Sequence, residues 1–63
     1  MEFVDKLYEV LKEETESFDA VYENYIIDVI GRRGLQTLFE NGRLEICGAI
    51  NGRRLYVLVE KKG

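Results

Sequence analysis

The stretch RLEICGAINGRRLYVLVE, residues 43–60, predicts a β-hairpin that turns at Asn51-Gly52. Asn-Gly between two runs rich in β-branched and aromatic residues is a strong hairpin signal, because a type I′ turn needs a positive φ at both central residues. Counting outward from the turn pairs Ile50 with Arg53 and alternates the side chains between two faces. A two-stranded hairpin is not stable alone in water, so the preceding residues must supply helices that cover its apolar face.

The two predicted faces of the hairpin differ in polarity. The face expected to pack on the helices carries Leu44, Ile46, Gly48, Leu55, Val57 and Val59, with Arg53 beside the turn. The outer face carries Arg43, Glu45, Cys47, Ala49, Arg54, Tyr56, Leu58 and Glu60.

Three helices are predicted ahead of the hairpin, because apolar side chains recur there with the α-helical period. The predicted helices span residues 2–16, 18–30 and 34–41. Fraying or a bend is expected at Thr15 to Ser17. Gly31 is expected to end the second helix in a left-handed conformation, and Asn41-Gly42 to end the third. We therefore predict an α+β fold, in which three helices are followed by a C-terminal antiparallel β-hairpin.

The predicted core joins the apolar stripes of these helices to the inner face of the hairpin. Its members are Phe3, Leu7, Leu11, Phe18, Val21, Tyr22, Ile26, Val29, Ile30, Leu35, Leu38, Phe39, Leu44, Ile46, Leu55, Val57 and Val59.

Length and composition limit the kinds of protein that this chain can be. Residues 1–63 are expected to form a single domain, near the lower size limit for a chain that folds alone. One cysteine cannot form an internal disulfide, and with no histidine beside it no zinc site is expected. No apolar run is long enough to span a membrane and no secretory signal is evident, so a cytoplasmic protein is expected.

Charge is divided unevenly along the chain, whose net charge is −3. Residues 1–30 hold two lysines against nine acids, a net charge of −7, whereas residues 31–63 hold seven bases against three acids, a net charge of +4. This asymmetry fits a basic binding surface with an acidic opposite side, and it equally fits two halves that attract each other.

Enzymatic chemistry is not expected. The chain has no histidine, which is the usual general base near neutral pH. Cys47 falls in the middle of a predicted strand, away from the groups that activate a thiol. No phosphate-binding loop, nucleotide fingerprint or metal-ligand cluster is present in the sequence. We therefore predict a binding module that uses no metal and no cofactor.

The order of helix, turn, helix and hairpin in residues 20–60 resembles the second half of winged helix-turn-helix domains. The resemblance is strongest in LQTLFENGRLEICGAINGRRLYVLVE, residues 35–60, where a helix ends at Asn41-Gly42 and a strand follows at once. In that family the second helix of the pair enters the major groove, and the wing touches the backbone or the minor groove. The resemblance implies a DNA-binding, transcription-regulatory module whose contacts come from Arg32, Arg33, Gln36, Arg53 and Arg54. The arginines would contact phosphates, and Gln36 would pair with an adenine edge.

The segment Gly31-Arg32-Arg33-Gly34 also looks like the GXXG loop of KH domains, which brings the backbone close to nucleic-acid phosphates. A KH fold needs a third strand beside the hairpin, and residues 1–17 are predicted to be helical, so this resemblance ranks below the winged helix. A helix-ending glycine followed by a turn is a third explanation of the same four residues, and the simplest one.

A small protein-binding regulator or inhibitor, of a phage or bacterial type, is the alternative function. Its contacts would come from the acidic first helix, with Glu13 and Glu14, or from the outer face of the hairpin, with Cys47, Tyr56 and Leu58. The acidic run equally fits a solvated helix face. The outer hairpin face is very apolar for so small a domain, so we expect it to be covered by the first helix or used as a partner surface, as in a homodimer.

Overall fold

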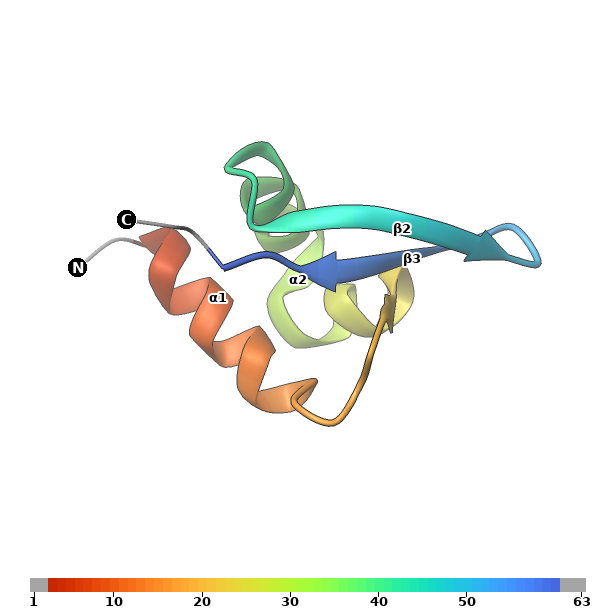
Figure 1. Ribbon diagram of the computed structural model, residues 1–63. Helices are drawn as coiled ribbons and strands as arrows, with labels where there is room; N and C mark the ends of the chain where they lie inside the picture. The colour runs from red at the N-terminus through yellow and green to blue at the C-terminus, as the bar shows by residue number, and fades with distance from the viewer. Residues whose placement is uncertain (1–2, 61–63) are drawn as a thin grey trace.

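The computed structural model describes residues 3–60, and within them two helices pack with a three-stranded antiparallel sheet (Figure 1). The helices are α1 (Phe3–Glu14) and α2 (Glu23–Glu40), and the strands are β1 (Val21–Tyr22), β2 (Leu44–Ile50) and β3 (Arg53–Leu58). The strand order is β1-β3-β2, so β3 is central and β2 lies at an edge. The turn end of the hairpin extends beyond the helices (Figure 1). The predicted helix start at residue 2 lies outside the described residues.

The prediction of three helices followed by a two-stranded hairpin is wrong. Residues 23–40 form one helix with a kink, where Gly31 has the non-helical torsions φ 83° and ψ 165°. Residues 18–22, predicted to begin a helix, instead lead into β1, where Val21 pairs with Tyr56. The apolar spacing of residues 18–22 suits a helix, but only the folded chain brings them beside the open edge of β3. Pairing there satisfies backbone groups that would otherwise lie unpaired.

The end of α1 confirms the predicted bend, because Thr15 to Ser17 form a turn directly after the helix. The Thr15 backbone N–H donates to the carbonyl oxygen of Leu11 at 3.0 Å, and its hydroxyl donates to the same oxygen at 2.9 Å. The hydroxyl of Tyr25 donates to the carbonyl oxygen of Glu14 at 3.3 Å, which ties α2 to this end of α1.

The hairpin turn is confirmed, since φ is 52° at Asn51 and 79° at Gly52. The three pairs nearest the turn are also confirmed: Ile50 with Arg53, Ala49 with Arg54 and Gly48 with Leu55. Beyond them the register shifts at Cys47, which is the extra residue of a β-bulge, and Ile46 pairs with Tyr56.

The bulge reverses which face of β3 packs on the helices. A shift of one residue in the pairing of β2 with β3 places the opposite set of β3 side chains on the same side as Leu44. Tyr56 is only 3% exposed and Leu58 packs against the core, although both were predicted to face outward. Leu55, Val57 and Val59 are instead half-buried on the other side. The predicted inward face of β3 is therefore wrong.

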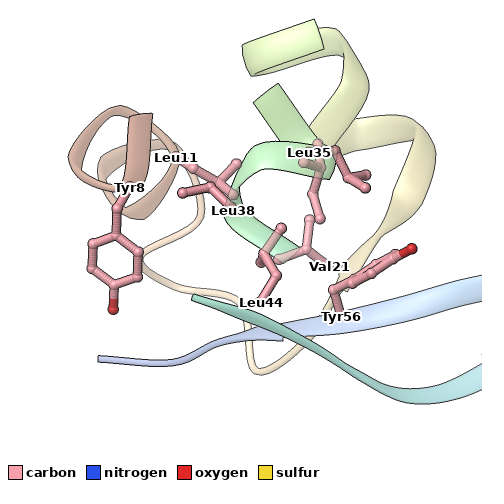
Figure 2. Close-up of a cluster of buried hydrophobic side chains, with 8 residues drawn as sticks. Tyr8, Leu11, Val21, Leu35, Leu38, Leu44 and Tyr56 are labelled. Atoms are coloured by element: carbon pink, nitrogen blue, oxygen red, sulfur yellow. The ribbon is translucent and has the colours of Figure 1, made fainter. Parts of the chain in front are cut away.

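Eight buried side chains from both helices and all three strands form the core (Figure 2). They are Tyr8, Leu11, Val21, Ile26, Leu35, Leu38, Leu44 and Tyr56. Leu11 of α1 lies against Leu38 of α2 (Figure 2), and both are fully buried. Burial of one such side chain stabilises the fold by about 1.5–3 kcal/mol.

Six members of the predicted core are confirmed as buried: Leu11, Val21, Ile26, Leu35, Leu38 and Leu44. Five predicted members are exposed instead: Phe3, Phe18, Tyr22, Phe39 and Ile46. Two of these lie against other rings at the surface, since Phe18 contacts Tyr25 with centroids 5.5 Å apart and Phe39 contacts Tyr56 at 6.3 Å. The sequence prediction missed two buried tyrosines, Tyr8 and Tyr56.

The predicted helix end at Asn41-Gly42 is confirmed, and the junction between α2 and the hairpin is a Schellman motif. Gly42 has φ 74°, its N–H donates to the carbonyl oxygen of Phe39 at 3.1 Å, and the N–H of Arg43 donates to that of Leu38 at 2.8 Å. These two bonds satisfy carbonyl groups that a helix end leaves free. The motif sets the direction in which β2 leaves the helix.

Candidate nucleic-acid interface

The part of α2 that follows the kink presents one polar side to solvent. Arg32, Arg33 and Gln36 are exposed there, whereas Leu35 and Leu38 are buried. At about 100° per residue, the three polar side chains fall within an arc of about 100° around the helix axis. The structure therefore brings these three predicted site residues together.

Two glycines make this geometry possible, each for its own reason. Gly31 combines φ 83° with ψ 165°, a region that is essentially open to glycine alone. Gly34 is buried, and a Cβ added there would lie 2.9 Å from Cβ of Ile30. Gly31 therefore permits the kink, and Gly34 permits the close approach of the two helical parts across it.

The side chain of Gln36 has a defined neighbour. Its Nε2 donates a hydrogen bond to Oε2 of Glu40 at 3.1 Å, one turn further along the exposed side of α2. A carboxylate therefore lies beside one of the three predicted contact residues, Gln36. Sequence reasoning did not single out Glu40, although its spacing of four residues from Gln36 is the signal that would have found it.

The hairpin holds the other two predicted contact residues on opposite sides of β3. Arg53 and Arg54 are both exposed, and they alternate because successive strand residues point to opposite faces. Arg54 shares its face with the buried Tyr56, so the prediction that Arg54 lies on the outer face is wrong. Arg54 Nη1 lies 4.0 Å from Oε2 of Glu23 at the start of α2. The two arginines therefore do not form one double contact at the wing tip.

The apolar partner surface predicted on the hairpin does not exist in the expected form. Tyr56 is buried in the core and Leu58 is half-buried against it, whereas Cys47 is exposed at the bulge. Tyr56 lies on the helix-facing side of the sheet, where the ring of Phe39 of α2 contacts it. The three residues proposed as one patch therefore lie in three different environments.

The acidic side chains of α1 line an open hollow of about 780 Å³, together with the end of the hairpin. Its lining residues are Asp5, Tyr8, Glu9, Lys12, Glu13, Glu16, Arg43 and Glu60. Glu13 belongs to this hollow. Glu14, the other acidic residue predicted to bind a partner, is exposed but does not line it.

One cation of the hollow is paired with a hairpin carboxylate. Lys12 Nζ lies 3.1 Å from Oε2 of Glu60, and both side chains are largely exposed. The hydrogen bond to Glu60, supported by the charge of the same carboxylate, raises the pKa of Lys12 above its ordinary value of 10.5. The pair links α1 to the residues that follow β3.

Arg43 is the second cation of the hollow, and its structural role was missed by sequence reasoning. Its side chain is 10% exposed, its Nη1 donates to Oδ1 of Asp5 at 2.8 Å, and its guanidinium lies 4.1 Å from the ring centroid of Tyr8. Nothing in its sequence position signals burial. The contact joins the start of β2 to α1.

Comparison with known proteins gave no match to a family model, to a curated protein or to a solved structure. Among the residues that the structure describes, neither helix is long and apolar enough to cross a membrane.

Proposed function

We propose that this protein is a small non-enzymatic module that binds duplex DNA and regulates transcription. The contacts come from the part of α2 that follows the kink, with additional contacts from the hairpin. One observation carries the proposal: Arg32, Arg33 and Gln36 lie together on the exposed side of a helical segment that leads directly into a projecting hairpin.

The arrangement around the kink supports the resemblance to winged helix-turn-helix domains. Two helical parts meet at Gly31, and β2 and β3 follow as the hairpin. A single α-helix fits the major groove of B-DNA, where its side chains reach the edges of the bases. Arg32 and Arg33 then contact phosphates, and Gln36 contacts a base edge.

A KH-type function is supported less well. The residues Arg32 to Gly34 continue the helix after the kink, so they do not form an open loop. Gly34 is buried beside Ile30, which explains this glycine by packing without any approach of a phosphate. The positive φ of Gly31 is explained by the kink itself.

We further place the protein in the cytoplasm. Cys47 is the one cysteine of the sequence and is exposed as a free thiol. Reducing compartments keep such thiols unpaired, whereas small secreted domains commonly use several disulfides.

The proposal is tested by fluorescence polarisation with labelled random-sequence duplexes and single strands, titrated with the full chain at several salt concentrations. Binding to duplex DNA is expected to weaken steeply as salt increases, because phosphate contacts release counterions. The variant Arg32→Gln/Arg33→Gln is expected to reduce the salt slope by about one for each phosphate contact that is lost.

The matched control is Lys6→Gln/Lys12→Gln, which removes the same charge from α1. An equal loss of affinity in the two variants would show that only net charge matters, and it would contradict a specific interface on α2. Absence of binding at low salt would remove the proposed function.

A second candidate, binding of a basic segment of a protein partner, is favoured by the acidic hollow beside α1. Once Arg43 is paired with Asp5 and Lys12 with Glu60, the hollow retains Glu9, Glu13 and Glu16 without a base among its lining residues. Capture of a lysine-rich peptide that is lost in Glu9→Gln/Glu13→Gln/Glu16→Gln, together with no DNA binding by the wild type, would favour this function.

A further inference from the structure

The exposed side of α2 changes chemical character along its length. Arg32, Gln36 and Glu40 follow one another at intervals of four residues, so they form one row along the helix. The row begins with a guanidinium, which only donates hydrogen bonds, and it ends with a carboxylate, which only accepts them. Gln36 lies between them and donates to Glu40 at 3.1 Å.

The hydrogen bond to Glu40 changes what Gln36 can offer to a ligand. A glutamine amide has two N–H donors and one carbonyl acceptor. One N–H is used by Glu40, which leaves one donor, the amide oxygen and the remaining acceptor sites of the carboxylate. The pair Gln36–Glu40 is therefore rich in acceptors, in contrast to the donor-rich pair Arg32 and Arg33.

From this contrast we infer that Glu40 is a specificity-determining residue for the DNA that the protein binds. The pair Gln36–Glu40 selects a base that presents an amino group in the major groove, adenine or cytosine, on the strand it contacts. This inference rests on the proposed function.

The physical reason is the pattern of groups in the major groove. Adenine presents the N6 amino group and cytosine the N4 amino group, which are both donors, whereas guanine presents O6 and N7 and thymine presents O4 as acceptors. A carboxylate and an amide oxygen turned towards guanine or thymine would leave acceptors on both sides without a hydrogen bond. The carboxylate of Glu40 also repels the phosphates of DNA. The Glu40 end of the row therefore faces base edges and not the DNA backbone.

The test begins with enrichment of duplexes from a random pool by the wild-type chain, by Glu40→Gln and by Glu40→Lys. The control is Glu45→Gln, which makes the same charge change at an exposed position of β2. One position of the enriched duplexes is expected to be adenine or cytosine on one strand for the wild type and for Glu45→Gln. Duplexes enriched by Glu40→Gln are expected to show no base preference at that position. Duplexes enriched by Glu40→Lys are expected to carry guanine or thymine there, because an ammonium group only donates hydrogen bonds.

Polarisation titrations with four duplexes that differ at that position then measure the preference. We expect about tenfold discrimination by the wild type, the size typical of one base contact, and less than about threefold by Glu40→Gln. Circular dichroism of each variant checks that the fold is retained.

The outcomes separate the inference from the proposed function. DNA binding with an unchanged consensus in Glu40→Gln and Glu40→Lys, or without any sequence preference in the wild type, overturns the inference and leaves the function in place. A wild-type preference for guanine or thymine at the position that Glu40→Lys alters also overturns it. Failure of the wild type to bind DNA removes both.

Discussion

Arg43 shows how one side chain can join elements that are far apart in the sequence. Its guanidinium reaches Asp5 at 2.8 Å and covers the ring of Tyr8, while its backbone takes part in the Schellman motif and accepts the N–H of Val59 at 2.8 Å. Nε of Arg43 is buried without a hydrogen-bond partner among the described residues. The side chain therefore depends strongly on Asp5 to balance its charge.

Asp5→Ala is expected to destabilise the fold more than Arg43→Met. Removal of Asp5 leaves a guanidinium that is nine-tenths buried without its counter-charge, at a cost of about 1–3 kcal/mol. Arg43→Met removes the charge and keeps an apolar stem over Tyr8, which is often nearly neutral for a buried ion. Urea denaturation at pH 7 measures both variants. A larger loss for Arg43→Met would show that stacking and hydrogen bonding outweigh the cost of burying the charge.

Gly34→Ala is expected to destabilise the fold by about 1–3 kcal/mol, because the new Cβ would meet Cβ of Ile30 at 2.9 Å. The near atom is the branch point of Ile30 and cannot turn away as a flexible chain end could. Thermal unfolding measures the loss. Ile30→Ala in the same chain should not restore stability, because alanine keeps the Cβ that the new side chain meets. The control is Gly48→Ala, where an added Cβ has no atom within 4 Å and little change is expected.

At the scale of elements, the kink in α2 depends on the backbone of one residue. An added Cβ at Gly31 meets no atom within 4 Å, so any cost of a substitution there comes from the torsions φ 83° and ψ 165°. This separates the position from Gly34, where the backbone is ordinary and space is lacking.

Gly31→Ala is expected to cost about 1–3 kcal/mol, whereas D-alanine at the same position is expected to fold at least as stably as glycine. A D-residue adopts positive φ without strain and has fewer unfolded conformations to lose. The two chains can be prepared by chemical synthesis and compared by urea denaturation. Equal losses of stability in both chains would show that any side chain at this position is unfavourable, and that the backbone torsions of the kink do not explain the need for glycine.

The link between α1 and the end of the hairpin has a predictable pH dependence. Because the hydrogen bond to Glu60 raises the pKa of Lys12 above 10.5, the pair stabilises the folded chain fully below pH 10.5. This contribution is lost as pH rises through the folded-state pKa. The difference in unfolding free energy between wild type and Glu60→Gln should therefore be constant from pH 7 to 9 and vanish at strongly alkaline pH. It should also shrink in high salt, since both side chains are exposed.

The elements divide into those that local signals predict and those that they do not. The turn at Asn51-Gly52 and the end of α2 at Asn41-Gly42 were predicted, because each needs a positive φ that these residues supply. The two-residue strand β1 was not predicted, because its pairing with β3 joins residues more than 30 positions apart. The bulge at Cys47 was not predicted either, since nothing near it in the sequence marks an extra residue.

At the scale of the whole molecule, Arg43 and Arg54 of the basic half lie beside Asp5 and Glu23 of the acidic half. The polar side of α2 after the kink, in contrast, lies away from α1. Leu38 lies against Leu11 of α1 (Figure 2). At about 100° per residue, Gln36 lies about 160° from Leu38 around the helix axis. Arg32, Arg33 and Gln36 therefore lie on the side of α2 that faces away from α1. The molecule measures 37 × 22 × 22 Å, and each of these dimensions exceeds the Debye length of about 8 Å at 0.15 M salt.

Glu9→Gln/Glu13→Gln/Glu16→Gln is accordingly expected to leave DNA affinity within about twofold of wild type at 0.15 M salt. At 0.01 M salt, where the Debye length is about 30 Å, the same variant should bind several-fold more tightly. Polarisation titrations at both salt concentrations check this. A large gain at 0.15 M salt would show that the acids lie close to the bound DNA, against the arrangement proposed for α2.

The candidate site also contains residues that the sequence identified and residues that only the structure revealed. Arg32, Arg33 and Gln36 were grouped through the resemblance to winged helix-turn-helix domains, with the two arginines expected in a turn. They share one helical side because the helix continues from Arg32. The neighbours that modify the site, Glu40 beside Gln36 and Glu23 beside Arg54, were not identified from the sequence. Glu23 in particular comes close to Arg54 only because β1 and β3 pair and bring the start of α2 to the hairpin.

By itself, the sequence determined two points where the chain must turn, the hairpin turn and the end of α2. It also marked Gly31 as an irregular position, although the structure has a kink there and not the predicted helix end. Each depends on torsions that a glycine or asparagine adopts at low cost, whatever the rest of the chain does. Only the tertiary structure decided the third strand, the bulge that turns Tyr56 inward and the burial of Arg43 against α1. These depend on the pairing and packing of residues far apart in the chain, where the free energy gained from burial and backbone hydrogen bonds outweighs the local pattern.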